Sequence, residues 1–268
     1  MSTILVESPA CRNCGALLQG RFCTNCGQED RPLDPSIGEV LGEVAREIST
    51  LDGRILRSVR RLFLSPGFLT TEHFEGRRVA WVSPVRLYLI FSVCYFAITS
   101  FTGASPLGVN LRSTGGNDEE TRQAIQKMGF STEEEMQRAI NQTLTTWIPR
   151  AMFLLVPAFA WLVSRARRRS GRKYPHHVIF ACHVFAVWFG AQAVAVAAGY
   201  LSGNTTVAFS LGVGSLLYAL IYMVLALRAV YGGTIARALA HTVVVLALYW
   251  LATIVVTVAI IVPVLCWD

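Results

Sequence analysis

The chain has 268 residues, of which 53% are hydrophobic and 15% are charged, and its formal net charge is +7 at pH 7. Soluble domains usually carry about 25% charged residues, so this composition argues against a soluble protein. No nucleic-acid partner is expected, because the cations between Met136 and Trp267 interrupt apolar stretches that contain no Asp or Glu. Cations placed in this way are typical of a membrane protein, where they fix orientation and contact anionic headgroups.

Two similar cysteine motifs lie near the N-terminus. Cys11-Arg-Asn-Cys14-Gly15 is followed by Cys23-Thr-Asn-Cys26-Gly27, and the two pairs supply four thiolates. Four thiolates at this spacing are typical of a closed, structural Zn²⁺ site, and the glycine after each pair favours a tight turn. We therefore predict a zinc ribbon over residues 1–30. An iron–sulfur centre or a thiol redox pair remains an alternative.

Residues 31–83 are expected to form a cytosolic helical linker. Ser36-Ile-Gly-Glu39 resembles a capping box, and apolar residues recur every three or four positions from Ile37 to Leu62. Asp52-Gly53 is expected to divide this helix in two. The second half is basic, with Arg54, Arg57, Arg60 and Arg61. It is compatible equally with a helix on the anionic inner leaflet and with a soluble helix packed on the metal module.

Residues 84–268 contain five apolar stretches long enough to cross a hydrocarbon core of about 30 Å as helices. They cover about 84–101, 148–163, 178–201, 206–227 and 240–265. The short connection at residues 202–205 predicts an antiparallel hairpin, and residues 102–147 are expected to form a solvated loop with a marginal helix around 119–140. The predicted fold class is an all-α polytopic membrane protein with about five transmembrane helices and an N-terminal zinc ribbon.

The basic residues predict the orientation of these helices. Six of the nine residues from Arg165 to Lys173 are Arg or Lys, and ten more precede Pro84. The positive-inside rule places both segments in the cytosol. We therefore expect a multi-pass protein of the cell inner membrane, with its N-terminus cytosolic and its C-terminus periplasmic.

A cluster of ionisable residues is predicted in the cytosolic half of the bilayer. His183 lies more than one turn inside the third stretch, where such a residue usually faces the bundle interior and marks a functional path. The predicted cluster consists of Arg86, His177, His183, Arg228, Arg237 and His241. Two simpler interpretations stay open: His183 is a neutral residue bonded to a neighbouring helix, and the arginines extend to lipid phosphates.

Four motifs together resemble a bacterial membrane family catalogued as domain of unknown function 3667. They are Cys11-x-x-Cys14-Gly15, Phe22-Cys23-x-x-Cys26-Gly27-Gln28, the segment from Pro66-Gly67 to Glu75-Gly76-x-Arg78, and His177-x-x-Phe180-x-x-His183. The resemblance implies an N-terminal zinc ribbon followed by several membrane helices. It implies no reaction.

Two classes of function fit these features. The first is a non-enzymatic scaffold or regulator whose ribbon and basic helix bind a cytosolic protein partner or anionic headgroups of the inner leaflet. The alternative is a small transporter or membrane enzyme that acts on an anionic or lipid-like substrate through the Arg/His cluster. No phosphate loop, nucleophile elbow or pair of catalytic carboxylates is found in the sequence.

Overall fold

The computed structural model describes residues 10–30, 53–104, 123 and 125–266. Its elements are helical, apart from isolated β-bridges within residues 10–30. The long helices are α4 (Pro84–Thr102), α6 (Glu133–Ala166), α7 (Tyr174–Ser202), α8 (Thr205–Tyr231) and α9 (Ile235–Cys266). Shorter elements are α2 (Arg54–Leu64), α3 (Phe68–Phe74) and the 3₁₀ turn η1 (Arg168–Ser170).

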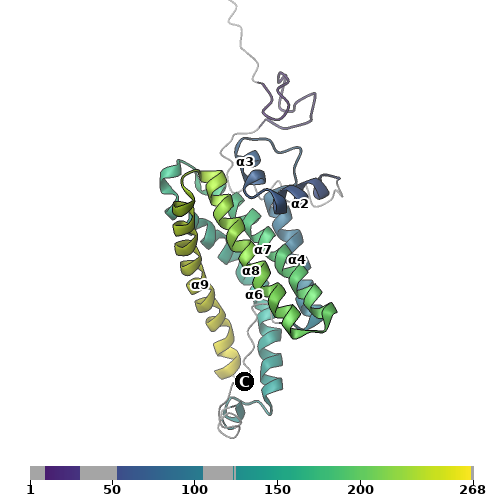
Figure 1. Cartoon of the computed structure of the whole chain (residues 1–268), viewed down its shortest axis with the longest axis vertical. Helices are drawn as coiled ribbons and strands as arrows, with labels where there is room; N and C mark the ends of the chain where they lie inside the picture. Colours follow the sequence, from purple (N-terminus) through teal and green to yellow (C-terminus); the bar gives the residue numbers. More distant parts are fainter. Residues whose placement is uncertain (1–9, 31–52, 105–122, 124, 267–268) are drawn as a thin grey trace, which may run out of the picture.

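The five long helices run along the long axis of the molecule, and each is long and apolar enough to cross a membrane (Figure 1). This confirms the predicted fold class of a multi-pass helical membrane protein. Residues 10–30, which we call the Cys module, lie with α2 and α3 at one end of the bundle, and the C-terminal end of α9 lies at the other (Figure 1). We call the first of these the module end.

The helix α7 forms the centre of the bundle. It packs along α4, α8 and α6, and α9 packs mainly on α6 at one edge. Buried aromatic residues such as Phe180 and Phe189 lie on α7. A helix that is apolar on all sides is expected at such a central position. By contrast α9 exposes apolar side chains such as Leu251 and Val255, as a helix in contact with lipid does.

The helix α6 is longer than the predicted second span. It begins at Glu133, so the last part of the predicted loop at 102–147 is helical. Thr132 caps the helix by accepting a hydrogen bond from the Glu135 N–H at 3.2 Å. The acidic first turn also favours this start, because carboxylates stabilise a helix N-terminus. The marginal helix predicted around 119–140 overlaps this start over residues 133–140. Sequence hydropathy did not join it to the second span, because hydropathy detects only the apolar part of the helix.

The predicted hairpin between the third and fourth spans is confirmed. α7 ends before Gly203, whose φ is +61°, and Asn204 caps α8 through its bond to the Thr206 N–H at 2.8 Å. Close packing near the turn requires another glycine, because a Cβ at Gly199 would lie 2.8 Å from the Ala208 Cβ. The two helices can therefore approach at small residues.

Of the predicted linker helix, only the second half lies within the described residues. The capping box at Ser36-Glu39 and the first half of the helix fall in residues 31–52, outside them. The described part begins as α2, immediately after Gly53. α2 buries Ser58 and Leu62 against the bundle and exposes Leu56 and Leu64 beside its arginines.

Candidate functional site

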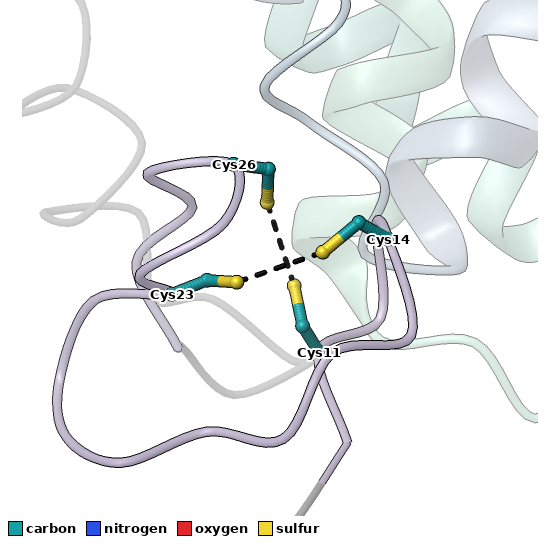
Figure 2. A group of neighbouring side chains, drawn as sticks. All are labelled: Cys11, Cys14, Cys23 and Cys26. Atoms are coloured by element: carbon teal, nitrogen blue, oxygen red, sulfur yellow. Dashed lines mark hydrogen bonds between the residues drawn. The ribbon is translucent and has the colours of Figure 1, made fainter.

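Four cysteine side chains converge within the Cys module (Figure 2). The sulfurs of Cys11, Cys14, Cys23 and Cys26 all lie within 4.8 Å of one another. Cys11 Sγ is 3.6 Å from Cys26 Sγ, and Cys14 Sγ is 3.6 Å from Cys23 Sγ. These separations far exceed the length of a disulfide, which is about 2.05 Å. They are close to the roughly 3.8 Å that follows from Zn–S bonds of about 2.3 Å in a tetrahedron.

The backbone explains why this short segment forms the cluster. In each turn the glycine N–H donates to the carbonyl of the first cysteine, from Gly15 to Cys11 and from Gly27 to Cys23, both at 2.8 Å. Gly15 and Gly27 have φ values of +76° and +71°, in the left-handed region that glycine adopts without strain. The repeated Cys-x-x-Cys-Gly pattern therefore builds two similar turns that present their sulfurs to a common point.

The cysteines differ in how readily they ionise without a cation. Hydrogen bonds from the backbone of Ala16 and the side chain of Asn25 lower the pKa of Cys14 to about 6. Burial is the main cause that raises the pKa of Cys26 to about 11. Metal binding requires all four thiolates, so it is coupled to proton release. The donor set fits a soft or borderline cation such as Zn²⁺, and it leaves no ligand position for a substrate.

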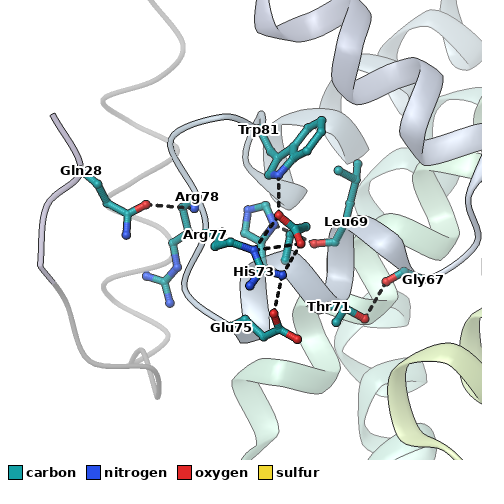
Figure 3. Close-up of polar contacts among 10 residues, drawn as sticks. Gln28, Gly67, Leu69, Thr71, His73, Glu75, Arg77, Arg78 and Trp81 are labelled. Atoms are coloured by element: carbon teal, nitrogen blue, oxygen red, sulfur yellow. Dashed lines mark hydrogen bonds and ion pairs between the residues drawn. The ribbon is translucent and has the colours of Figure 1, made fainter. Parts of the chain in front are cut away.

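The Cys module is attached to the bundle through Gln28 (Figure 3). Gln28 is buried, its Nε2 donates to the Gly76 carbonyl at 2.8 Å, and its Oε1 accepts from the Arg78 N–H at 3.1 Å. One amide side chain thus bonds both a carbonyl and an N–H of the loop between α3 and α4. Because Gln28 follows Gly27 directly, the geometry of the second cysteine turn determines where the module contacts the bundle.

Gln28→Ala is expected to detach the module without removing its metal. The substitution leaves the Gly76 carbonyl and the Arg78 N–H without their hydrogen-bond partner, at a cost of about 1–3 kcal/mol. Hydrogen exchange at the Arg78 amide should therefore accelerate, while metal content stays at the wild-type level. Gln19→Ala is the matched control, because Gln19 belongs to the same module and is exposed. Unchanged exchange in Gln28→Ala would contradict this attachment.

The loop that receives Gln28 is itself held by a charged network (Figure 3). Arg77 Nε donates to both carboxylate oxygens of Glu72, at 3.0 and 2.9 Å, and Arg77 also pairs with Glu75. Trp81 Nε1 donates to Glu72 at 3.2 Å. The hydrogen bond from Arg77 is the main cause that lowers the pKa of Glu72. The stabilisation from this carboxylate is thus present at neutral pH and is lost as the pH falls through its lowered pKa.

His183 lies against α3 inside the bundle. Its Nδ1 is 2.9 Å from Thr70 Oγ1, and its ring is 5.6 Å from that of His73. His73 Nδ1 donates to the Leu69 carbonyl at 2.9 Å, and burial lowers the pKa of His73 to about 4, so this imidazole is neutral at pH 7. His183 Nε2 is buried and makes no hydrogen bond to a described residue.

Gly67 allows α3 to lie this close to α8. Gly67 directly precedes the first residue of α3 and has a φ of +81°. A Cβ added at this position would lie 3.0 Å from the Ala229 Cβ and 3.2 Å from the Ala226 carbonyl oxygen, both in α8. A larger residue would push α3 away from both α7 and α8. The Pro66-Gly67 segment therefore positions Thr70 and His73 over His183.

The other residues of the predicted cluster lie in four further places. His177 bonds Tyr231 of α8, with 2.8 Å between Nδ1 and the hydroxyl oxygen. Arg237 and His241 line a polar cavity at the module end. Arg86 is buried in α4, and Arg228 is exposed on α8. Of the six residues, the structure thus brings Arg237 and His241 to one cavity and distributes the others.

Four residues of these sites were not singled out by the sequence analysis. Thr70 and His73 lie in a helix of seven residues, too short to show a periodic pattern. Tyr231 looked like an ordinary aromatic residue at a span end, and Arg167 was one of several cations in a basic loop. For Thr70 and His73 the sequence offered one indication only, the Pro66-Gly67 turn that lies three residues before Thr70.

The fold and the cysteine site together define a multi-pass membrane protein with a four-cysteine cluster that could hold a metal ion. A family described as protein of unknown function (DUF3667) matches residues 52–96. The resemblance noted in the sequence is confirmed over this segment, which contains α2, α3 and most of α4. The cysteine and His177–His183 motifs lie outside the matched residues. No curated protein and no solved structure matches the chain.

Proposed function

We propose that this protein is a non-enzymatic scaffold or regulator of the inner membrane, which presents a structural zinc ribbon to a cytosolic protein partner. The observation that carries the proposal is the attachment of a closed four-thiolate site to the bundle through Gln28. A closed site offers no position for substrate chemistry, but it folds a segment too short to have a core of its own. Such a segment is suited to recognition.

The surface of the module supports this role. Leu17 and Phe22 are 65% and 57% exposed, although the module contains few apolar residues that could form a core. Arg21 Nε donates a hydrogen bond to Glu29 Oε1 at 2.8 Å, and this ion pair stabilises the segment beside Phe22. Apolar side chains that are exposed on a stably folded segment are typical of protein contact sites. The arginines of α2, beside exposed Leu56 and Leu64, suit the anionic inner leaflet.

The proposed orientation places the module end in the cytosol. This end carries the cations of α2 and of residues 165–173, and the positive-inside rule assigns such segments to the cytosol. A reporter inserted at Gly171 should therefore read as cytosolic, and one fused after Trp267 should read as periplasmic. The reverse result at either position would contradict the orientation.

Site-specific photo-crosslinking tests the proposed partner. A crosslinker at Phe22 should capture a protein, whereas one at Phe101, 81% exposed at the end of α4, should capture lipid. The captured protein is then purified, and its affinity should fall in Phe22→Ser with metal content unchanged. Lipid adducts alone at Phe22 would exclude a protein partner for this surface.

A second candidate is a small transporter or membrane enzyme that acts on an anionic or lipid-like substrate. It is supported by the cavity that Arg237 and His241 share. Turnover or transport of such a substrate that is lost in Arg237→Gln but kept in Phe22→Ser would favour this candidate over the scaffold.

A further inference from the structure

A basic cavity lies where the ends of α6 and α8 meet the start of α9. Its volume is about 480 Å³. The charged and polar side chains in its wall are those of Arg167, Arg168, Arg169, Tyr231, Arg237 and His241. The cavity thus combines four guanidinium groups at the ends of three predicted membrane spans.

Arg167 is the buried member of this group. It is 8% exposed, and its Nη2 donates to the Leu227 carbonyl at 3.3 Å and to the Gly232 carbonyl at 3.5 Å. These bonds cap the C-terminus of α8, where a cation is favoured. Its Nε is buried and has no hydrogen-bond partner among the described residues. Burial, with repulsion from Arg237 as a smaller cause, lowers the pKa of Arg167.

The helices that form the cavity carry carboxylates only in the first turn of α6, at the opposite end of that helix from the cavity. No Asp or Glu occurs from Met136 to Trp267, a stretch that includes most of α6 and all of α7 and α8. Across the module end, Glu72 and Glu75 both pair with Arg77. Within the residues that the structure describes, none of the four cavity arginines forms an ion pair. Because buried and clustered cations are usually paired, we expect a ligand to supply the counter-charge.

The hydrogen-bonding groups of the cavity select a phosphate. Guanidinium groups bind phosphate oxygens through paired N–H donors, and several of them can surround one phosphate. His241 adds a buried Nδ1 that makes no hydrogen bond within the described residues. Two polar atoms of the residues that line the cavity, this one and the Arg167 Nε, thus lack a hydrogen-bond partner among the described residues.

A second, apolar cavity lies farther along the same three helices, α6, α8 and α9, whose meeting line we call the seam, and side chains of α7 also line this cavity. Its volume is about 100 Å³, and its walls include Ala219 and Met223 of α8, Leu246 and Trp250 of α9, and Phe159 of α6. His241 precedes Leu246 by five residues, which corresponds to about 7.5 Å along a helix. The seam is therefore basic at the end of the spans and apolar within them.

We propose that this seam binds one anionic phospholipid, with its phosphate in the basic cavity and part of an acyl chain in the apolar cavity. A free phosphate would use only the basic cavity and would leave the apolar one unexplained. General attraction of headgroups to surface arginines would not require a buried Arg167. The inference does not depend on either proposed function, because binding is measured on the purified protein.

Native mass spectrometry of the full chain in mild detergent tests the proposal, with phosphatidylglycerol and phosphatidylcholine as probes. Arg237→Gln should weaken phosphatidylglycerol binding roughly tenfold, because each charge-assisted contact is strong. Arg228→Gln is the matched control, since Arg228 is an exposed cation on α8 outside the cavity wall. Arg167 is left intact because it also caps α8.

A second pair of variants tests the acyl chain. Ala219→Leu fills the apolar cavity and should also weaken phosphatidylglycerol binding roughly tenfold. Ala259→Leu, on the exposed part of α9, should leave it unchanged. Inorganic phosphate should compete weakly with the lipid, and phosphatidylcholine should bind less tightly than phosphatidylglycerol.

Three outcomes would overturn the proposal. If Ala219→Leu binds phosphatidylglycerol as the wild type does, no acyl chain occupies the apolar cavity. If Arg228→Gln and Arg237→Gln lose the same affinity, the lipid is held by surface charge. If inorganic phosphate binds as tightly as the lipid, the site is a soluble-anion site.

Discussion

Replacing Cys23 by serine is expected to abolish tight metal binding and to unfold the Cys module. Cys23 is 2% exposed, and its thiolate is one of four that meet at a single point. The binding free energy of a structural zinc, about 10–16 kcal/mol, is largely the folding free energy of such a segment. The purified wild type should hold about one zinc per chain, and Cys23→Ser should hold almost none.

Two measurements distinguish loss of the metal from general damage. Limited proteolysis within residues 10–30 should become fast in Cys23→Ser, while the helical bundle stays resistant. Cys94→Ser is the control, because Cys94 is an exposed cysteine of α4 outside the cluster, and it should keep both metal and protection. An iron–sulfur absorption spectrum in the wild type would refute the zinc assignment.

The cysteine cluster could be predicted because all its ligands lie within sixteen consecutive residues. At this spacing the chain has few ways to arrange four sulfurs, and the two glycines identify the turns. The five spans were predictable for a different reason, since a long apolar stretch is itself the signal for a membrane helix. Both features are local in sequence.

The polar sites could not be predicted because they depend on which faces of distant helices meet. His183 bonds Thr70, 113 positions away, and His177 bonds Tyr231, 54 positions away. The predicted topology placed the Arg/His cluster in the cytosolic half of the bilayer, but it gave no rotation about each helix axis and no contact with Thr70 or Tyr231. Of the predicted cluster, Arg237 and His241 share a cavity, and the buried arginine beside them, Arg167, was assigned only to a basic loop.

The contact with Thr70 defines a structural role for His183 that experiment can separate from a functional one. If the contact between His183 Nδ1 and Thr70 Oγ1 holds α3 in place, His183→Phe leaves the buried Thr70 hydroxyl without this partner. Stranding such a group costs about 1–3 kcal/mol. Measured couplings between polar side chains in membrane proteins average about 0.6 kcal/mol and reach about 1.7. We therefore expect a moderate loss of thermal stability in detergent.

A double-mutant cycle with Thr70→Val decides between the two roles. Replacing both partners by apolar groups should restore part of the stability lost in His183→Phe, because no buried polar group of the pair then lacks a partner. Thr71→Val is the matched control, since Thr71 Oγ1 donates to the Gly67 carbonyl within its own segment and should show no coupling to His183. For a structural His183, complementation of a gene deletion should follow protein abundance across all these variants. A stable His183→Phe protein that is abundant but fails to complement would instead assign His183 to the functional path.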